Sequence, residues 1–347
     1  MNQGHRFSKI ARTAALLVLA AAAGRSLAAQ SLDIPSKDWG ISFGNSKAFT
    51  GLRFNVRDSR VVRVTGVNIT LWRPRKDDKD AVVTGLSLGL APGGGRLRGV
   101  QMGLLGAGAE ASMIGLNLGG IGVGAGEDLV GINIGGLGAG AGKDVKGLTV
   151  GGLGAGAGES LEGIVVGGLG AGAGKNLTGI CFGGLGAGAG GTFKGLGIGG
   201  LGIGAGEDLV GVAIGGLGAG CGEKLTGVVV AGLGAGAGER LTGLAVCGLA
   251  AGAPEIRGLV IGGIGAGGKD LRGAFIGAAM IRVEKGGRLE GLAASSFNHI
   301  RGTLNGVSIG IVNYAWKIGK GLQLGIVNIV RDNPKGLRVL PVFNTRF

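Results

Sequence analysis

Histidine, cysteine, proline and tyrosine are all scarce in this chain. Its 347 residues include two histidines, three cysteines, six prolines and one tyrosine. Zinc sites need several His or Cys ligands at short spacing, and no Cys-x-x-Cys or His-Glu-x-x-His motif is present. We interpret His299 as a surface turn residue rather than a catalytic base. The sequence therefore predicts a protein that is not an enzyme, with no catalytic residue, no metal site and no cofactor.

The three cysteines occupy three different positions of the repeat described below. An exported chain can form disulfides, but cysteines that do not recur at one position are poorly placed to pair. We expect Cys181, Cys221 and Cys247 to be free thiols.

No apolar run in the sequence is long enough to cross a bilayer as a helix. The N-terminal run at Ala14–Ala23 covers about ten residues, whereas about 20 are needed. It follows Arg6, Lys9 and Arg12 and precedes small residues suited to cleavage, which is the organisation of a secretory signal peptide. We expect residues 1–29 to be removed and the mature protein to be exported.

Acidic residues are in the minority. Beyond residue 29 the chain has 31 basic and 21 acidic residues, a net charge of +10. The basic residues are dispersed singly rather than in blocks, so no nucleic-acid partner is expected. A basic field of this kind favours anionic lipid or envelope polysaccharide as partners.

Glycine, by contrast, is in large excess, with 85 residues. The tetrad glycine, apolar, any, apolar recurs nineteen times from Gly51 to Gly336, every 16 residues between Gly99 and Gly243. A repeat this short cannot bury its apolar side chains alone, but identical units can stack at about 4.8 Å and share a core. We predict an all-β solenoid of about 19 units of 15–16 residues.

Each unit contains two short stretches in which residue types alternate, separated by a glycine pair. In the unit at residues 147–162 the alternation predicts that Thr149 points outward. The residues expected to point inward are Leu148, Val150, Leu153, Ala155, Ala157 and Leu161.

The glycines that alternate with alanine are expected to form a flat outer face without side chains. Such a face lets another sheet or a polymer approach closely, so we expect self-association through it. The candidate interaction face consists of Gly138, Gly140, Gly154, Gly156, Gly170, Gly172, Gly186 and Gly188.

The composition changes toward both ends. We divide the mature chain into an N-terminal cap with irregular repeats at 30–98, regular glycine-rich repeats at 99–290, and C-terminal asparagine-containing repeats with a cap at 291–347. The tryptophans lie outside the regular array, and we interpret them as end caps that protect exposed strand edges. They are Trp39, Trp72 and Trp316.

Asparagine recurs in the C-terminal units at steps of 15, 15 and 16 residues. Two interpretations remain open: amides stacked and hydrogen-bonded along the rod axis, or asparagines that simply suit turns. The residues are Asn298, Asn313, Asn328 and Asn344.

The block at 306–347, GVSIGIVNYAWKIGKGLQLGIVNIVRDNPKGLRVLPVFNTRF, resembles the exported glycine-rich surface-repeat proteins of didermal bacteria, whose short units read Gly-Leu-Gln-apolar-Gly-apolar-apolar-Asn. The resemblance implies a surface-related role in the periplasm, in the outer membrane or on the cell surface. It implies no catalytic residues.

Three functions are compatible with these features. We favour a non-enzymatic structural or adhesive surface module. The alternatives are an outer-membrane β-barrel with one strand per unit, and a carbohydrate-binding or polysaccharide-acting β-helix. One tyrosine and the break in alternation at the glycine pair count against the barrel.

Overall fold

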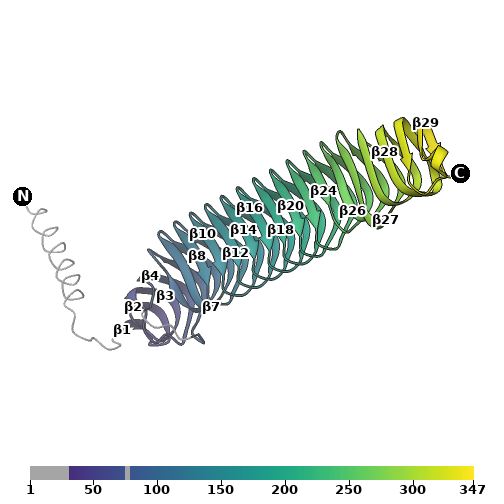
Figure 1. Cartoon of the computed structure of the whole chain (residues 1–347). Coiled ribbons are helices and arrows are strands. Elements are labelled where there is room, and N and C mark those ends of the chain that lie inside the picture. Colours follow the sequence, from purple (N-terminus) through teal and green to yellow (C-terminus); the bar gives the residue numbers. More distant parts are fainter. Residues whose placement is uncertain (1–30, 75–78) are drawn as a thin grey trace, which may run out of the picture.

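The computed structural model describes residues 31–74 and 79–347, so the expected signal peptide lies outside the described residues. The chain forms an all-β solenoid of about 16 turns, which confirms the predicted architecture. Figure 1 shows a rod whose coils follow one another in sequence order from one end to the other. Strands of successive coils pair in parallel, whereas a membrane β-barrel with one strand per unit would pair them antiparallel.

Each central coil contributes a longer and a shorter strand. The longer strands are β9 (Asp128–Gly135), β11 (Val145–Gly151), β13 (Leu161–Gly167), β15 (Leu177–Gly183), β17 (Phe193–Gly199), β19 (Leu209–Gly215), β21 (Lys224–Ala231), β23 (Arg240–Cys247) and β25 (Glu255–Gly262). The shorter strands are β8 (Gly122–Ala125), β10 (Gly138–Ala141), β12 (Gly154–Ala157), β14 (Gly170–Ala173), β16 (Gly186–Ala189), β18 (Gly202–Ala205), β20 (Gly218–Cys221), β22 (Gly234–Ala237) and β24 (Ala250–Gly252).

The two ends of the rod have longer or less regular elements. The N-terminal strands are β1 (Ser31–Pro35), β2 (Trp39–Gly44), β3 (Ala48–Arg57), β4 (Arg63–Trp72), β5 (Val82–Gly89), β6 (Gly93–Gly103) and β7 (Gly106–Gly119). The C-terminal elements are β26 (Gly265–Gly277), β27 (Met280–Ala294), β28 (Phe297–Val330), a 3-10 helix η1 (Lys335–Leu337) and β29 (Val339–Thr345).

The first glycine of each tetrad from Gly51 to Gly306 lies inside a strand and holds a positive φ. The angle is +104° at Gly147 and +125° at Gly163, a region that L side chains rarely adopt. An ideal Cβ on Gly163 would lie 2.2 Å from the carbonyl oxygen of Gly147 in the preceding coil. Backbone conformation and close approach both therefore require glycine, which explains why the tetrad recurs.

The inward-facing set differs from the expected one. Leu161, Ala155 and Ala157 are buried as predicted. Leu153, however, is 49% exposed at a corner, whereas Thr149 is fully buried. The predicted orientations of these last two residues are wrong.

These errors concern which side of β11 is buried. Val145, Thr149 and Gly151 are buried and lie two or four residues apart, so they share the inner side of the strand. Leu148 and Val150 flank Thr149 and are consequently turned outward, where both are only partly buried, so their predicted inward orientation is also wrong.

A column of polar side chains runs inside the N-terminal half of the rod, at the position that Thr149 occupies. Asn117 Nδ2 donates to Asn133 Oδ1 at 2.7 Å, and Asn133 Nδ2 donates to Thr149 Oγ1 at 3.0 Å. In the coils from Val165 to Ala293 the same position is apolar or glycine, and it becomes polar again at Ser308. The polar column, in register from coil to coil, is Ser42, Arg53, Asn68, Ser87, Gln101, Asn117, Asn133 and Thr149.

The C-terminal asparagines form a second ladder, at the position of Ala155. Asn298 Nδ2 donates to Asn313 Oδ1, and Asn313 Nδ2 donates to Asn328 Oδ1, both at 2.8 Å. Asn344 Nδ2 donates instead to the main-chain oxygen of Asn328 at 3.1 Å. All four side chains are fully buried, so the stacked-amide interpretation is confirmed for the first three.

Both ends are closed by a strand that runs antiparallel to its neighbour. β1 pairs with β2, and β29 pairs with β28.

Gly336 lies in η1 and does not begin a coil, so the nineteenth predicted unit is wrong. Trp39, Trp72 and Trp316 are 59%, 42% and 54% exposed, and Trp39 lies on β2 beside the terminal strand β1, so the end-cap interpretation stays a prediction.

Two leucines of one coil provide a matched test of these orientations. Leu161→Asp places an unpaired carboxylate in the core and should cost several kcal/mol, enough to abolish cooperative folding. Leu153→Asp adds a solvated charge and should shift the midpoint of thermal unfolding by only a few degrees. Similar midpoints for the two variants, measured by circular dichroism, would refute the assignment.

Glycine positions can be compared in the same way. Gly163→Ala forces a Cβ against the Gly147 carbonyl and should destabilise strongly. In Gly154→Ala the new Cβ meets its nearest atom, the Gly170 carbonyl oxygen, at 3.7 Å, an ordinary contact. We expect denaturant unfolding to show a loss of more than about 2 kcal/mol only for the first variant. An equal loss in both would contradict the close-contact explanation.

Candidate functional site

The eight glycines of the candidate interaction face stack in register on β10, β12, β14 and β16. The alanines between them point into the core, and seven of the eight alanines on these strands are buried. The glycines form two rows that differ in available space. A Cβ on Gly154 would lie 3.7 Å from the nearest carbonyl oxygen, but a Cβ on Gly156 would lie 2.9 Å from that of Gly172. Only the first row can accept a side chain, so the glycine face is flat partly because its backbone is crowded.

Beside the glycine face lies an apolar surface that the sequence analysis placed inside the rod. In eleven successive coils the residue at the corner that Leu153 occupies is Leu or Ile and is at least 39% exposed. Main-chain hydrogen bonds join this corner from coil to coil, as from Leu153 N to Leu137 O at 2.7 Å. The corner row is Leu105, Ile121, Leu137, Leu153, Leu169, Leu185, Leu201, Leu217, Leu233, Leu249 and Ile264.

Two further rows run along the outside of the longer strands. They occupy the positions of Leu148 and Val150; Ile132 and Ile164 in the first row are 45% and 43% exposed, and Ile134 in the second is 41% exposed. Together with the corner row they form what we call the apolar face. At its C-terminal end the surface is hollowed by a cavity of about 950 Å³. Its lining includes Ile309, Ile311, Leu324, Ile326 and Val342.

The charged turn residues carry both signs and form a solvated edge of the rod. Lys175 Nζ lies 2.8 Å from Glu159 Oε2, and Lys143 Nζ lies 3.4 Å from Glu127 Oε2 in an earlier pair of coils. The hydrogen bond from Lys175 holds the pKa of Glu159 below its usual value. These pairs are exposed and contribute little to stability.

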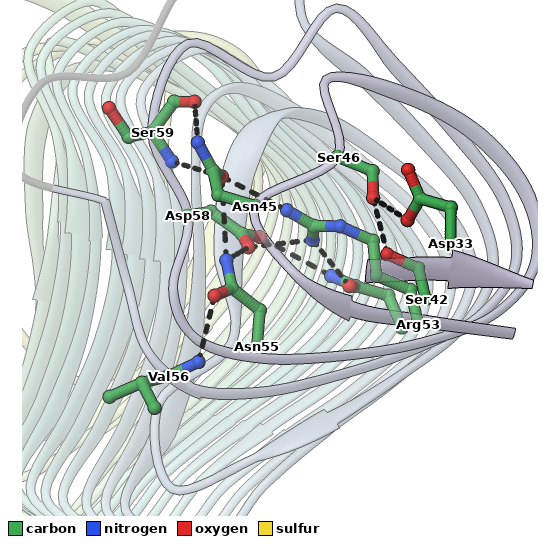
Figure 2. A network of polar contacts seen from close by, with 10 residues as sticks. Asp33, Ser42, Asn45, Ser46, Arg53, Asn55, Val56, Asp58 and Ser59 are labelled. Atoms are coloured by element: carbon green, nitrogen blue, oxygen red, sulfur yellow. Dashed lines mark hydrogen bonds and ion pairs between the residues drawn. The ribbon is translucent and has the colours of Figure 1, made fainter. Parts of the chain in front are cut away.

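A buried polar network occupies the N-terminal end of the rod (Figure 2). The Arg53 side chain is fully buried, and its Nη1 donates to Asp58 Oδ1 at 2.6 Å and to Asn68 Oδ1 at 2.8 Å. Asn55 Nδ2 also donates to Asp58 Oδ1, at 2.7 Å. The ion pair and hydrogen bonds of Arg53 satisfy most of the buried charge, so the interior of the first coils is packed with polar rather than apolar contacts.

The serines of this network hydrogen-bond to one another and to a carboxylate. Ser46 Oγ donates to Asp33 Oδ1 at 2.8 Å and contacts Ser42 Oγ. Burial acts to raise the pKa of Asp33, but hydrogen bonds from Ser42, Ser31 and Ser46 outweigh it and lower the pKa overall. The hydrogen bonds of this group, as far as the structure describes the chain, include no imidazole to act as a base.

His299 lies on β28 and not in a turn, so its assignment as a turn residue is wrong. Its ring stacks on Phe297 with centroids 5.3 Å apart and meets the edge of Tyr314 at 5.2 Å.

Within residues 31–74 and 79–347, no three His, Cys, Asp or Glu side chains are grouped closely enough to hold a metal ion. Over the same residues, no helix is long and apolar enough to span a membrane.

Comparison with protein-family models, with curated proteins and with solved structures found no match for this chain.

The three cysteines are free, as expected, and Cys181 and Cys247 are buried. Burial raises the pKa of Cys181 from 9.0 to about 11. The folded state therefore favours the neutral thiol. The raised pKa of Cys181 contributes stability that is fully present below pH 9 and is lost as the pH rises toward 11.

This pKa shift predicts an alkaline loss of stability that Cys181→Val removes. Valine occupies the same inward position in the preceding coil, at Val165, so the variant should fold. Between pH 8 and 10.5, the free energy of unfolding should fall more steeply for the wild type than for Cys181→Val. Identical pH profiles in urea denaturation would show that Cys181 does not titrate in this way.

Proposed function

We propose that this protein is a non-enzymatic, exported structural or adhesive rod that associates side by side with other copies of itself. The observation that supports this best is the corner row, in which eleven successive coils each expose a Leu or Ile. Soluble monomers rarely expose contiguous apolar patches larger than a few hundred Å², and such patches mark interaction sites.

The energetics favour association over exposure. Fully burying one Leu or Ile gains about 1.5–3 kcal/mol, so covering a half-exposed side chain gains roughly 1 kcal/mol. The corner row alone then contributes on the order of 10 kcal/mol, comparable with the 4–15 kcal/mol that association costs. The two outer rows of the apolar face add to this gain, so the sum favours a stable complex.

The repeat of the rod favours a second copy as the partner. Coils follow one another at about 4.8 Å, so the apolar rows present ridges with that period. Another copy carries the same period and can interdigitate with these ridges along its whole length. The adjoining glycine face has no side chains to hold a neighbouring rod away.

The location of the rod in the cell envelope rests on the organisation of residues 1–29 as a signal peptide and on the resemblance of residues 306–347. A rod that presents flat faces over many coils is suited to building or coating a surface. Envelope polysaccharide and anionic lipid are further partners consistent with the basic net charge.

Substitution of the corner row tests the proposal. The triple variant Leu153→Gln, Leu169→Gln and Leu185→Gln should sediment as a monomer at concentrations where the wild type forms dimers or larger species. A matched control, Ile114→Gln, Val130→Gln and Val210→Gln, makes the same change at outward positions on another side of the coil. The control should associate like the wild type.

Two results would reject lateral association through this face: a wild type that is monomeric at high concentration, or a corner variant that associates as strongly as the control. The contribution of the glycine face is measured separately with Gly154→Thr and Gly170→Thr, because that row has room for a side chain. Gly156→Val is unsuitable, since crowding at Gly172 would confound folding with association.

A further inference from the structure

The glycine face ends in a different surface at the C-terminal coils. The row that contains Gly156 continues in register as Gly267, Arg282 and His299. The row that contains Gly154 continues as Met280 and Phe297. Bare backbone is thus replaced by aromatic and basic side chains on the same side of the rod.

A pocket of about 450 Å³ opens at this end. Its walls come from three successive coils: Lys285 and the neighbouring glycines, then Arg301, then Tyr314, Trp316 and Lys317. The first wall is an insertion in β27. The pairing of β27 with β26 and with β28 shifts register between Val283 and Arg288, and Gly286 within this segment has a φ of +75°. The extra residues raise a rim above an otherwise flat face.

The pocket is positively charged. Lys285, Arg301 and Lys317 form no ion pair with any residue in the described parts of the chain, and no carboxylate lines the pocket. Several cations of the central coils do pair with a carboxylate, as Lys175 does with Glu159 and Lys143 with Glu127. Burial, followed by the charges of Arg301 and Arg282, lowers the pKa of His299, so its imidazole is neutral at pH 7.

The pocket also carries one of the three tryptophans, and its indole is 54% exposed. An exposed indole beside a tyrosine provides apolar surface with polar edges, which suits the C–H face of a sugar ring. Lysine and arginine bind carboxylates through charge-assisted hydrogen bonds. The volume lies within the range of small-ligand sites.

We propose that this pocket binds an acidic sugar, such as a uronic-acid unit of an anionic polysaccharide. The carboxylate would pair with Arg301 and Lys317 while the ring packs on Trp316. A neutral sugar would leave three cations unpaired, and a free phosphate would leave the aromatic wall unused. The pocket lies away from the corner row, so the proposal does not depend on lateral association.

The test is titration of the mature protein with a galacturonic acid trisaccharide, followed by tryptophan fluorescence and calorimetry. Maltotriose and inorganic phosphate serve as comparison ligands at the same ionic strength. We expect the acidic trisaccharide to bind more tightly than either, and its affinity to fall as salt is added.

Two variants and one control locate the site. The double variant Arg301→Gln and Lys317→Gln should weaken binding by at least about tenfold, as should Trp316→Leu. Lys194→Gln with Lys320→Gln removes two exposed cations from another side of the coil and should leave the affinity unchanged. All substituted side chains are exposed, so the unfolding midpoint should not move.

Three outcomes would overturn the proposal. They are no binding of the acidic trisaccharide, equal affinity for inorganic phosphate, and unchanged affinity in Trp316→Leu. Sedimentation of the same variants should match the wild type, which separates failure of this proposal from failure of lateral association.

Discussion

The rod depends on one close contact, in which the tetrad glycines from Gly66 to Gly321 each lie against the main-chain oxygen of the tetrad glycine one coil earlier. At Gly179 the space for a Cβ is only 2.0 Å from the Gly163 oxygen. Coil length can vary, provided that this contact is kept. Between Gly273 and Gly291 the coil has 18 residues rather than 15 or 16, and the surplus is placed in a register shift while the two glycines remain paired.

The buried polar columns provide what near-identical coils lack, namely a preferred partner for each coil. In the central array a slip by one coil would exchange one apolar interior for another at little cost. At the ends the same slip would separate Arg53 from Asn68 and break the hydrogen bond between the Asn298 and Asn313 side chains in the buried interior. We infer that these columns set the stacking register, as single buried polar residues do in coiled coils.

The sequence predicted the stacking but not the side of the coil that each residue faces. The tetrad period and the inward Ala155 and Leu161 follow from spacing alone, because the coil repeats without exception from Gly99 to Gly243. The error at Leu153 and Thr149 arose from equating apolar with buried. A coil of 16 residues encloses a narrow interior, filled by alanines and one or two larger residues such as Leu161 and Val165, so the surplus Leu, Ile and Val side chains lie outside.

The C-terminal pocket was missed for a related reason. Its residues lie on three coils, and no local motif joins them. A signal was present in the 15-residue steps from His299 to Tyr314 and from Arg301 to Trp316, which place each pair at one position of adjacent coils. The two proposed surfaces lie on different sides of the coil, so both can be occupied at once. Rods packed in the same direction would gather their pockets at one end and bind a polymer with avidity, whereas oppositely directed rods would cross-link it.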